Sequence, residues 1–284
     1  MMGEEALKAA KKLGERLKKT ALKSVGRYSE DVRYGATGDA TYEVDEPVER
    51  EVEEFFQDLR IPCRVMTEDT GVRDFGKKPE YVFLIDPLDG SRNARRGLPM
   101  HCASIAVYGI RAKELSDAKY AVIERFDADE EYVAIKGEGA TLNGKKISPS
   151  KKAVLDDAII AMGCHFASTI PLFSDVGRRL GALTSRDERN IMVKCYGSTA
   201  LELAFLACGK VDFIYDLRAG TGFSLALKTY DVAAGILLCR EAGAIVEYGC
   251  RKIPEKLPVD PKVKVQIAGA GNKRFYDLLK KAAK

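Results

Sequence analysis

The chain has 284 residues, of which 46% are hydrophobic and 31% charged, so it can bury the core of an ordinary globular protein. Its formal net charge of +4 is small for this length and argues against a nucleic-acid-binding protein, which would carry a basic patch with interleaved aromatic residues. Seven scattered cysteines, no signal-peptide pattern and no apolar run of the ~18–20 residues that span a bilayer predict a cytoplasmic protein without membrane contact.

The first half of the chain predicts two helices and a run of strands. Apolar residues at helical spacing predict an amphipathic helix over about residues 3–25 and a second helix over Glu46–Leu59, with Asp45 as its N-cap and Pro47 in its first turn. A glycine-punctuated loop or hairpin, residues 34–41, separates them. Strands that follow two helices indicate a mostly antiparallel sheet with helices on one face. These strands are expected near residues 64–66, 81–85, 102–110, 119–124 and 131–135.

The pattern changes near Ser148–Lys151, where we place a boundary between an α+β half, residues 1–150, and an α/β half, residues 151–284. Strands and helices then alternate, which is typical of a three-layer α/β unit. Thr199 and Glu202 have the spacing of a capping box. The expected elements are strands at 158–162, 191–193, 211–215 and 265–268, and helices at 173–183, 199–208, 231–242 and 273–283, the third of which Asp231 opens.

The most informative segment is Leu84–Asn93, where an apolar run ends in two carboxylates. The run predicts a buried strand that ends at Asp86, and Pro87 then turns the chain so that Asp89 follows. Both carboxylates and the Leu88 carbonyl can point into one small volume. Three converging oxygen donors suit a hard divalent cation such as Mg²⁺.

The residues after this pair suit a phosphate group. Gly90 and Ser91 present backbone N–H groups at the mouth of a turn or short helix, which is a natural phosphate cradle. Cation and cradle together predict chemistry on a phosphate ester. Other acidic residues could join the site, although each also reads as an N-cap or a turn residue: Asp39, Asp45, Glu68, Asp69 and Asp231.

These motifs as a set resemble the inositol monophosphatase family, and above all its archaeal branch, which acts on inositol phosphate and on fructose 1,6-bisphosphate. They occur in the family's order. The matching segments are Gly38–Thr41 with Asp45 and Glu49, Thr67–Asp69, Asp86–Asn93, Gly97–Pro99, Ser104–Ala106, Tyr230–Gly235 and Glu241–Ala244. The chain departs from the usual pattern without losing a metal ligand, with Ser91 in place of Thr, Asp69 in place of Glu and Tyr230 in place of Trp.

The resemblance implies a layered αβαβα sugar-phosphatase fold, a homodimer and a site between the two halves. It also implies two to three Mg²⁺ ions. Their ligands would be Glu68, Asp86 and the Leu88 carbonyl for the first, Asp86, Asp89 and Asp231 for the second, and Glu68 with Asp39 for a weaker third.

The resemblance further implies in-line attack by a metal-activated water on the phosphate. Ser91, hydrogen-bonded to Asp45, would orient and deprotonate that water next to the ion on Glu68. Thr199 at its helix start would help hold the phosphate. The full substrate-binding set would be Asp89, Gly90, Ser91, Thr199, Asp216, Lys194 and Arg218.

The sequence says least about which ester is hydrolysed. The resemblance implies that Asp216 contacts sugar hydroxyls, and the cations Lys194, Arg218, Arg92, Arg95 and Arg96 could take a second phosphate. We expect a Mg²⁺-dependent phosphomonoesterase that acts on inositol 1-phosphate and fructose 1,6-bisphosphate. A phosphatase of 3′-phosphoadenosine 5′-phosphate or NADP would need an adenine pocket, for which the sequence has no signal. The intact carboxylates argue against a non-catalytic phosphosugar-binding protein.

Overall fold

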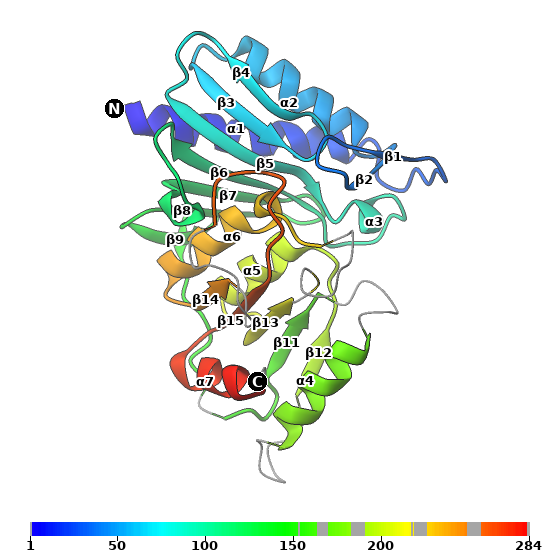
Figure 1. Ribbon diagram of the computed structural model, residues 1–284, viewed down its shortest axis with the longest axis vertical. Coiled ribbons are helices and arrows are strands. Elements are labelled where there is room, and N and C mark those ends of the chain that lie inside the picture. Colours follow the sequence, from blue (N-terminus) through cyan, green and yellow to red (C-terminus); the bar gives the residue numbers. More distant parts are fainter. Residues whose placement is uncertain are drawn as a thin grey trace.

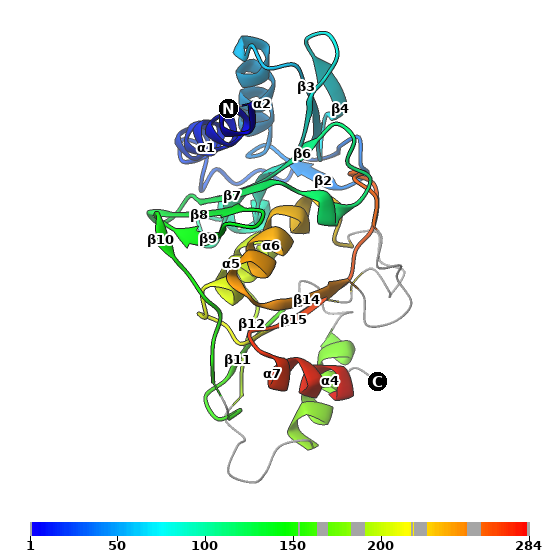
Figure 2. The same cartoon turned by 90° about the vertical axis from the view of Figure 1, so that its left-hand side faces the viewer.

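The computed structural model describes residues 2–152, 154–163, 170–182, 191–216, 218, 226–248 and 257–282. Within these ranges, three layers of helices alternate with two β-sheets (Figure 1). The view turned by 90° shows the same stack, with one helix pair enclosed between the sheets (Figure 2). The expected αβαβα layering is therefore confirmed.

The first layer consists of α1 (Met2–Ala21) and α2 (Glu46–Asp58), which cover the outer face of the first sheet. α1 presents fully buried Leu13 and Leu17 to this sheet, as its apolar spacing predicted. A separate hairpin, β1 (Val32–Tyr34) with β2 (Ala40–Tyr42), occupies the expected glycine-rich segment.

Eight described strands form the first sheet, and all neighbouring pairs are antiparallel except β3 with β5. Both faces are buried, and β5 shows why. Its Val82 and Leu84 pack on the side of the enclosed helices, while Phe83 and Ile85 face α1 and α2. The expectation of helices on one face was wrong, because an unbroken apolar strand needs cover on both sides. The strand order is β10 (Lys145–Lys146), β9 (Gly139–Leu142), β8 (Glu130–Ile135), β7 (Tyr120–Arg125), β6 (Cys102–Gly109), β5 (Tyr81–Asp89), β3 (Cys63–Thr67) and β4 (Gly71–Phe75).

The enclosed layer is made by α5 (Thr199–Ala207) and α6 (Thr229–Ala242). Every residue of α5 is buried, as expected of a helix that is apolar all round. Both helices come from the second half of the chain, yet they pack on the first sheet and share its core. The division into two halves at residue 150 therefore stays a prediction.

The second sheet and the last helical layer complete the stack. β11 lies parallel to β12 and β13, whereas β15 is antiparallel to β13 and β14. The order is β12 (Met192–Lys194), β11 (Ile159–Met162), β13 (Phe213–Asp216), β15 (Ile267–Ala270) and β14 (Ile245–Tyr248), and the outer helices are α4 (Ile170–Ala182) and α7 (Lys273–Ala282). The short elements α3 (Ser91–Ala94) and the 3₁₀ helix η1 (Leu115–Asp117) lie in connections. None of the helices in the described ranges combines the length and apolarity that crossing a membrane requires.

Candidate active site

A β-bulge brings the two carboxylates of the central motif onto one face of the first sheet. β5 pairs with β6 through Asp86 and Ser104, and the next pair is Asp89 with Cys102, so β5 contains one extra residue. Residues three apart in a regular strand would point to opposite faces. The expected strand end at Asp86 was wrong, because the bulge tolerates Pro87 and the strand continues to Asp89.

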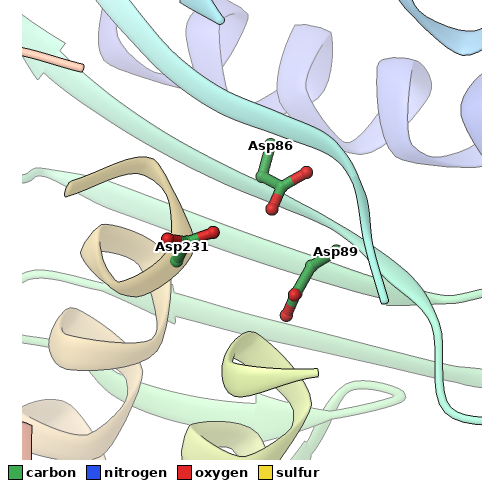
Figure 3. A group of neighbouring side chains, drawn as sticks. All are labelled: Asp86, Asp89 and Asp231. Carbon is green, nitrogen blue, oxygen red and sulfur yellow. The ribbon is translucent and has the colours of Figure 1, made fainter. Parts of the chain in front are cut away.

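Asp231 joins these two carboxylates from the enclosed helix layer. One oxygen each of Asp86, Asp89 and Asp231 lies within 4.8 Å of the others, and Figure 3 shows the three side chains turned toward one another. The expectation that Asp231 opens its helix was wrong. α6 begins at Thr229, and the Asp231 carboxylate accepts a hydrogen bond of 2.6 Å from the backbone N–H of Lys228 at the N-cap.

Burial and mutual repulsion make this cluster costly to ionise. Burial raises the pKa of Asp231 to about 8, and the charge of Asp89 adds to the effect. Burial also raises the pKa of Asp89 to about 6, although hydrogen bonds from Ser198 and Ala200 oppose it. The pKa values of Asp86 and Glu68 are raised well above the ordinary range, again by burial first and by neighbouring carboxylates second. Oxygen-only donors with unbalanced negative charge fit a hard divalent cation.

The start of α5 holds Asp89 in place. Ser198 Oγ and the Ala200 N–H each donate to Asp89 Oδ2 over 2.7 Å. The predicted capping box from Thr199 was wrong by one residue, because Ser198 is the N-cap. Glu202 instead accepts a hydrogen bond of 3.1 Å from the Tyr196 N–H.

Gly90 allows the chain to turn sharply into α3. Its φ of +91° is unfavourable for other residues, and a Cβ there would lie 2.5 Å from the Met100 carbonyl oxygen. The turn places Ser91 at the first position of α3, where its Oγ donates to the Leu88 carbonyl over 3.0 Å. All four residues of this turn, Leu88–Ser91, line the same cavity as Asp86 and Asp231.

Asp45 lies beside Ser91, and the role that the resemblance implies for this pair stays a prediction. Burial raises the pKa of Asp45 to about 7, against the hydrogen bond of 2.7 Å from the Tyr42 N–H and the nearby Ser91 hydroxyl. The Asp45 side chain makes no cap bond to α2, although Asp45 occupies the N-cap position. A carboxyl with this pKa can exchange a proton with a neighbouring hydroxyl near neutral pH.

Glu49 supports the loop that carries Glu68, and the prediction of site residues omitted it. Thr67 Oγ1 donates to one Glu49 oxygen over 3.0 Å, and the Asp69 N–H donates to the other over 3.1 Å. Burial raises the pKa of Glu49 to about 7. An acidic residue on the apolar face of α2, beside Val48, was the available sequence signal.

Asp39 lies beside the cluster but is not one of its three converging carboxylates. Its Oδ2 forms an ion pair with Lys228 Nζ and accepts a hydrogen bond from the Tyr230 hydroxyl. The same Lys228 Nζ donates to the Thr37 carbonyl over 2.7 Å. Lys228 carried no signal in the sequence, because an isolated lysine reads as a surface residue.

The cations named in the sequence analysis occupy different places. Arg218 lines the cavity and its Nε lies 2.9 and 3.1 Å from the two oxygens of Asp216. Lys194 is exposed on the edge strand β12, away from the described lining of the cavity.

The arginines after the central motif also lie in different places. Arg95 stacks on the rings of Tyr28 and Tyr42, at 4.4 and 4.3 Å from their centroids. Arg92 lies at the cavity.

The site is a cavity of about 320 Å³ lined by residues of the first sheet, of the β1–β2 hairpin and of the starts of α5 and α6. This volume is enough for a small sugar phosphate. Of the predicted site residues, the cavity is lined by Asp39, Glu68, Asp86, Leu88, Asp89, Gly90, Ser91, Thr199, Arg218 and Asp231.

The profile of the inositol monophosphatase family matches residues 2–284. The chain belongs to the inositol monophosphatase family. This is a family of metal-dependent phosphatases of small phosphorylated sugars, in accord with a carboxylate cluster that could hold a metal ion. The family resemblance that the motifs indicated is therefore confirmed.

Individual relatives agree with this assignment. A Thermococcus kodakarensis protein named fructose-1,6-bisphosphatase/inositol-1-monophosphatase is 31% identical over 283 residues, covering 99% of this chain and 96% of the relative. A Methanococcus maripaludis protein named bifunctional NADP phosphatase/NAD kinase is 27% identical over 282 residues, covering 92% of this chain and 46% of the relative. The crystal structure of extragenic suppressor protein suhB from Bartonella henselae shares the fold, with a TM-score of 0.78 at 23% identity over 99% of this chain and 98% of that chain.

Proposed function

We propose that the protein is a Mg²⁺-dependent phosphomonoesterase that hydrolyses inositol 1-phosphate and fructose 1,6-bisphosphate. The observation that carries the proposal is the convergence of Asp86, Asp89 and Asp231 within 4.8 Å, next to the Ser91 turn. We further propose that it acts in the cytoplasm as a homodimer. Four of the described cysteines are free, which suits a reducing compartment: Cys63, Cys102, Cys208 and Cys239.

The carboxylates would hold two Mg²⁺ ions. Asp86, Asp89 and Asp231 would bind one, and Asp86 would share the other with Glu68 and the Leu88 carbonyl, all of which line the cavity. Such ions supply a lowered pKa for water and neutralise charge on the phosphoryl group. The protein would keep the five ligands in place through the β5 bulge, the α5 cap on Asp89 and the Lys228 N–H on Asp231.

The remaining residues would orient the reactants. The Ser91 hydroxyl would accept a proton from the attacking water and give its own proton to the neighbouring carboxylate of Asp45. The N–H groups of Gly90 and Ser91 would hold phosphate oxygens at the start of α3. Arg218, which lines the cavity, would recognise a hydroxyl or a second phosphate of the substrate, and Asp216, outside the described lining, would hold Arg218 in place. Because Lys194 lies outside the lining, it has no part in this proposal.

A second candidate, hydrolysis of the 2′-phosphate of NADP, is favoured by the similarity to the Methanococcus maripaludis NADP phosphatase/NAD kinase. The catalytic residues would be the same, and only the recognition of the leaving group would differ. The intact carboxylate cluster argues against a binding protein without activity.

Phosphate release from inositol 1-phosphate, fructose 1,6-bisphosphate, NADP and 3′-phosphoadenosine 5′-phosphate, with Mg²⁺ or with EDTA, tests the proposal. We expect Mg²⁺-dependent release from the first two. Since loss of a residue that only supports a metal ligand costs about 10–100-fold, Asp89→Asn and Asp231→Asn should each lower kcat/KM by at least about 100-fold. Asp127→Asn, outside the cavity lining, is the matched control. Undiminished release in EDTA, or near-normal rates in both pocket variants, would refute the proposal.

A further inference from the structure

Lys228 is a buried lysine whose backbone is fixed at the active site. It is the N-cap of α6 and only 3% exposed. Its backbone forms a β-bridge with Lys264, and its N–H donates to the carboxylate of Asp231. Because these two contacts fix the backbone of Lys228, its side chain starts from a fixed position beside Asp231.

The side chain crosses to the loop between β1 and β2 in the first half of the chain. Its Nζ pairs with the Asp39 carboxylate and donates to the Thr37 carbonyl over 2.7 Å. A carboxylate and a carbonyl are also the oxygen ligands that a hard divalent cation would use. The ammonium group therefore occupies the position beside Asp39 Oδ2 and the Thr37 carbonyl that a further cation there would take, while Asp39 Oδ1 has no hydrogen-bond partner among the described residues.

The charges of the cavity lead to the same conclusion. The described lining contains five carboxylates, namely Asp39, Glu68, Asp86, Asp89 and Asp231. Lys228 balances the charge of Asp39. Of the two arginines in the lining, Arg218 is paired with Asp216, and Arg92 is exposed to solvent. Two divalent ions would carry four positive charges, which match the four carboxylates that remain. A third divalent ion would leave an excess of positive charge in a buried space, which is costly.

We propose that Lys228 is a built-in cation that removes Asp39 from the set of metal ligands, so that the site holds two divalent ions instead of three. This inference rests on the proposed function and deepens it by assigning the metal stoichiometry. It replaces the sequence-based expectation that Asp39 helps hold a third ion. Lys228 is thus a positioning residue, which acts through Asp39 and not on the substrate.

The test counts the Mn²⁺ ions bound per full-length chain, with free Mn²⁺ measured by electron paramagnetic resonance. We expect two ions for the unchanged protein and two for Asp39→Asn. Lys228→Met should bind one ion more, because it frees the Asp39 carboxylate and the Thr37 carbonyl. The charge-conserving variant Lys228→Arg and the double variant Lys228→Met with Asp39→Asn should both return to two.

The outcomes separate this inference from the proposed function. Two ions in both the unchanged protein and folded Lys228→Met would overturn the inference, while Mg²⁺-dependent phosphate release would still support the phosphatase. Loss of one ion in Asp39→Asn alone would also overturn it, and this variant decides the question if Lys228→Met does not fold. If the unchanged protein binds no Mn²⁺ and releases no phosphate, both proposals fail.

Discussion

Two groups of acidic side chains in this protein have opposite electrostatic surroundings. Around Arg125, the guanidinium lies 2.7 Å from Asp127 and 3.0 Å from Glu130. Burial alone would raise the pKa of Asp127, but its hydrogen bonds and charge contact with Arg125 outweigh burial and lower it. In the cavity, burial and repulsion raise the pKa values of Asp86 and Asp231.

The difference shows what distinguishes a structural ion-pair network from a candidate metal site. The Arg125 group also contains Lys210, paired with Glu130, so the protein supplies its own positive charge there. The cavity group has three carboxylate oxygens within 4.8 Å and raised pKa values, so its charge balance depends on something that binds. A cluster of carboxylates that lines a cavity and has raised pKa values therefore indicates a functional site more strongly than an acidic cluster does by itself.

The largest effect is expected at Ser91, the cavity residue whose hydroxyl we propose orients the attacking water. Ser91→Ala should lower kcat by about 100-fold or more, which is the usual contribution of a positioned proton acceptor. Ser91→Thr keeps the hydroxyl and should stay within about tenfold of the unchanged protein, since a tenfold change is only about 1.4 kcal/mol. Steady-state phosphate release measures both. Equal rates for the Ala and Thr variants would remove Ser91 from the mechanism.

Metal binding should stabilise the cavity group but leave the Arg125 group unaffected. At a Mg²⁺ concentration about 100 times the Kd, the free energy of unfolding should rise by about 2.7 kcal/mol per site. Chemical unfolding with Mg²⁺ and with EDTA gives the difference. Asp89→Asn should lose most of this gain, whereas Asp127→Asn should keep it. A similar gain in both variants would place the metal elsewhere.

Without metal, neutralising one acid in each group should change stability in opposite directions. Asp231→Asn relieves repulsion and should raise the free energy of unfolding in EDTA at about pH 8.5 by about 1 kcal/mol. Asp127→Asn removes a charged partner of Arg125 and should lower it by about 1–2 kcal/mol. Urea denaturation compares the two. Destabilisation of equal size in both variants would contradict the electrostatic distinction.

The last effect is a pH dependence and concerns Glu202, an acid buried in α5. Burial raises its pKa to about 8, so the folded protein holds a proton that the unfolded chain loses above about pH 4.5. Stability is therefore present at low pH and falls as the pH rises toward 8. Glu202→Gln removes this loss, and between about pH 5.5 and 8 its stability relative to the unchanged protein should improve by about 1 kcal/mol or more. Parallel pH slopes in EDTA would show that Glu202 ionises normally.

Local sequence patterns predicted most elements of the fold, but not their ends or their neighbours. The spacing of Leu13 and Leu17 identified α1, and the alternation after residue 150 identified the α/β character of the second half. The patterns missed β4, β9, β10 and β14, which are short strands whose stability comes from their partners in the sheet. They also placed the start of α6 at Asp231, because capping depends on backbone geometry that a residue type only suggests.

The residue types of the site were evident from the chain alone. Asp86 and Asp89 stood out because two acids follow directly after an apolar run, whereas Asp231, which by itself reads as an N-cap, was indicated by the family resemblance. Their convergence depended on the bulge that β5 forms against β6 and on the packing of α6 against the first sheet, and this second contact joins segments more than 100 residues apart. The partnership of Lys228 with Asp39 spans a similar separation. Periodicity and local spacing in the sequence indicate which residues of a segment are buried. Which charged residues pair with one another depends on which segments meet in the folded chain.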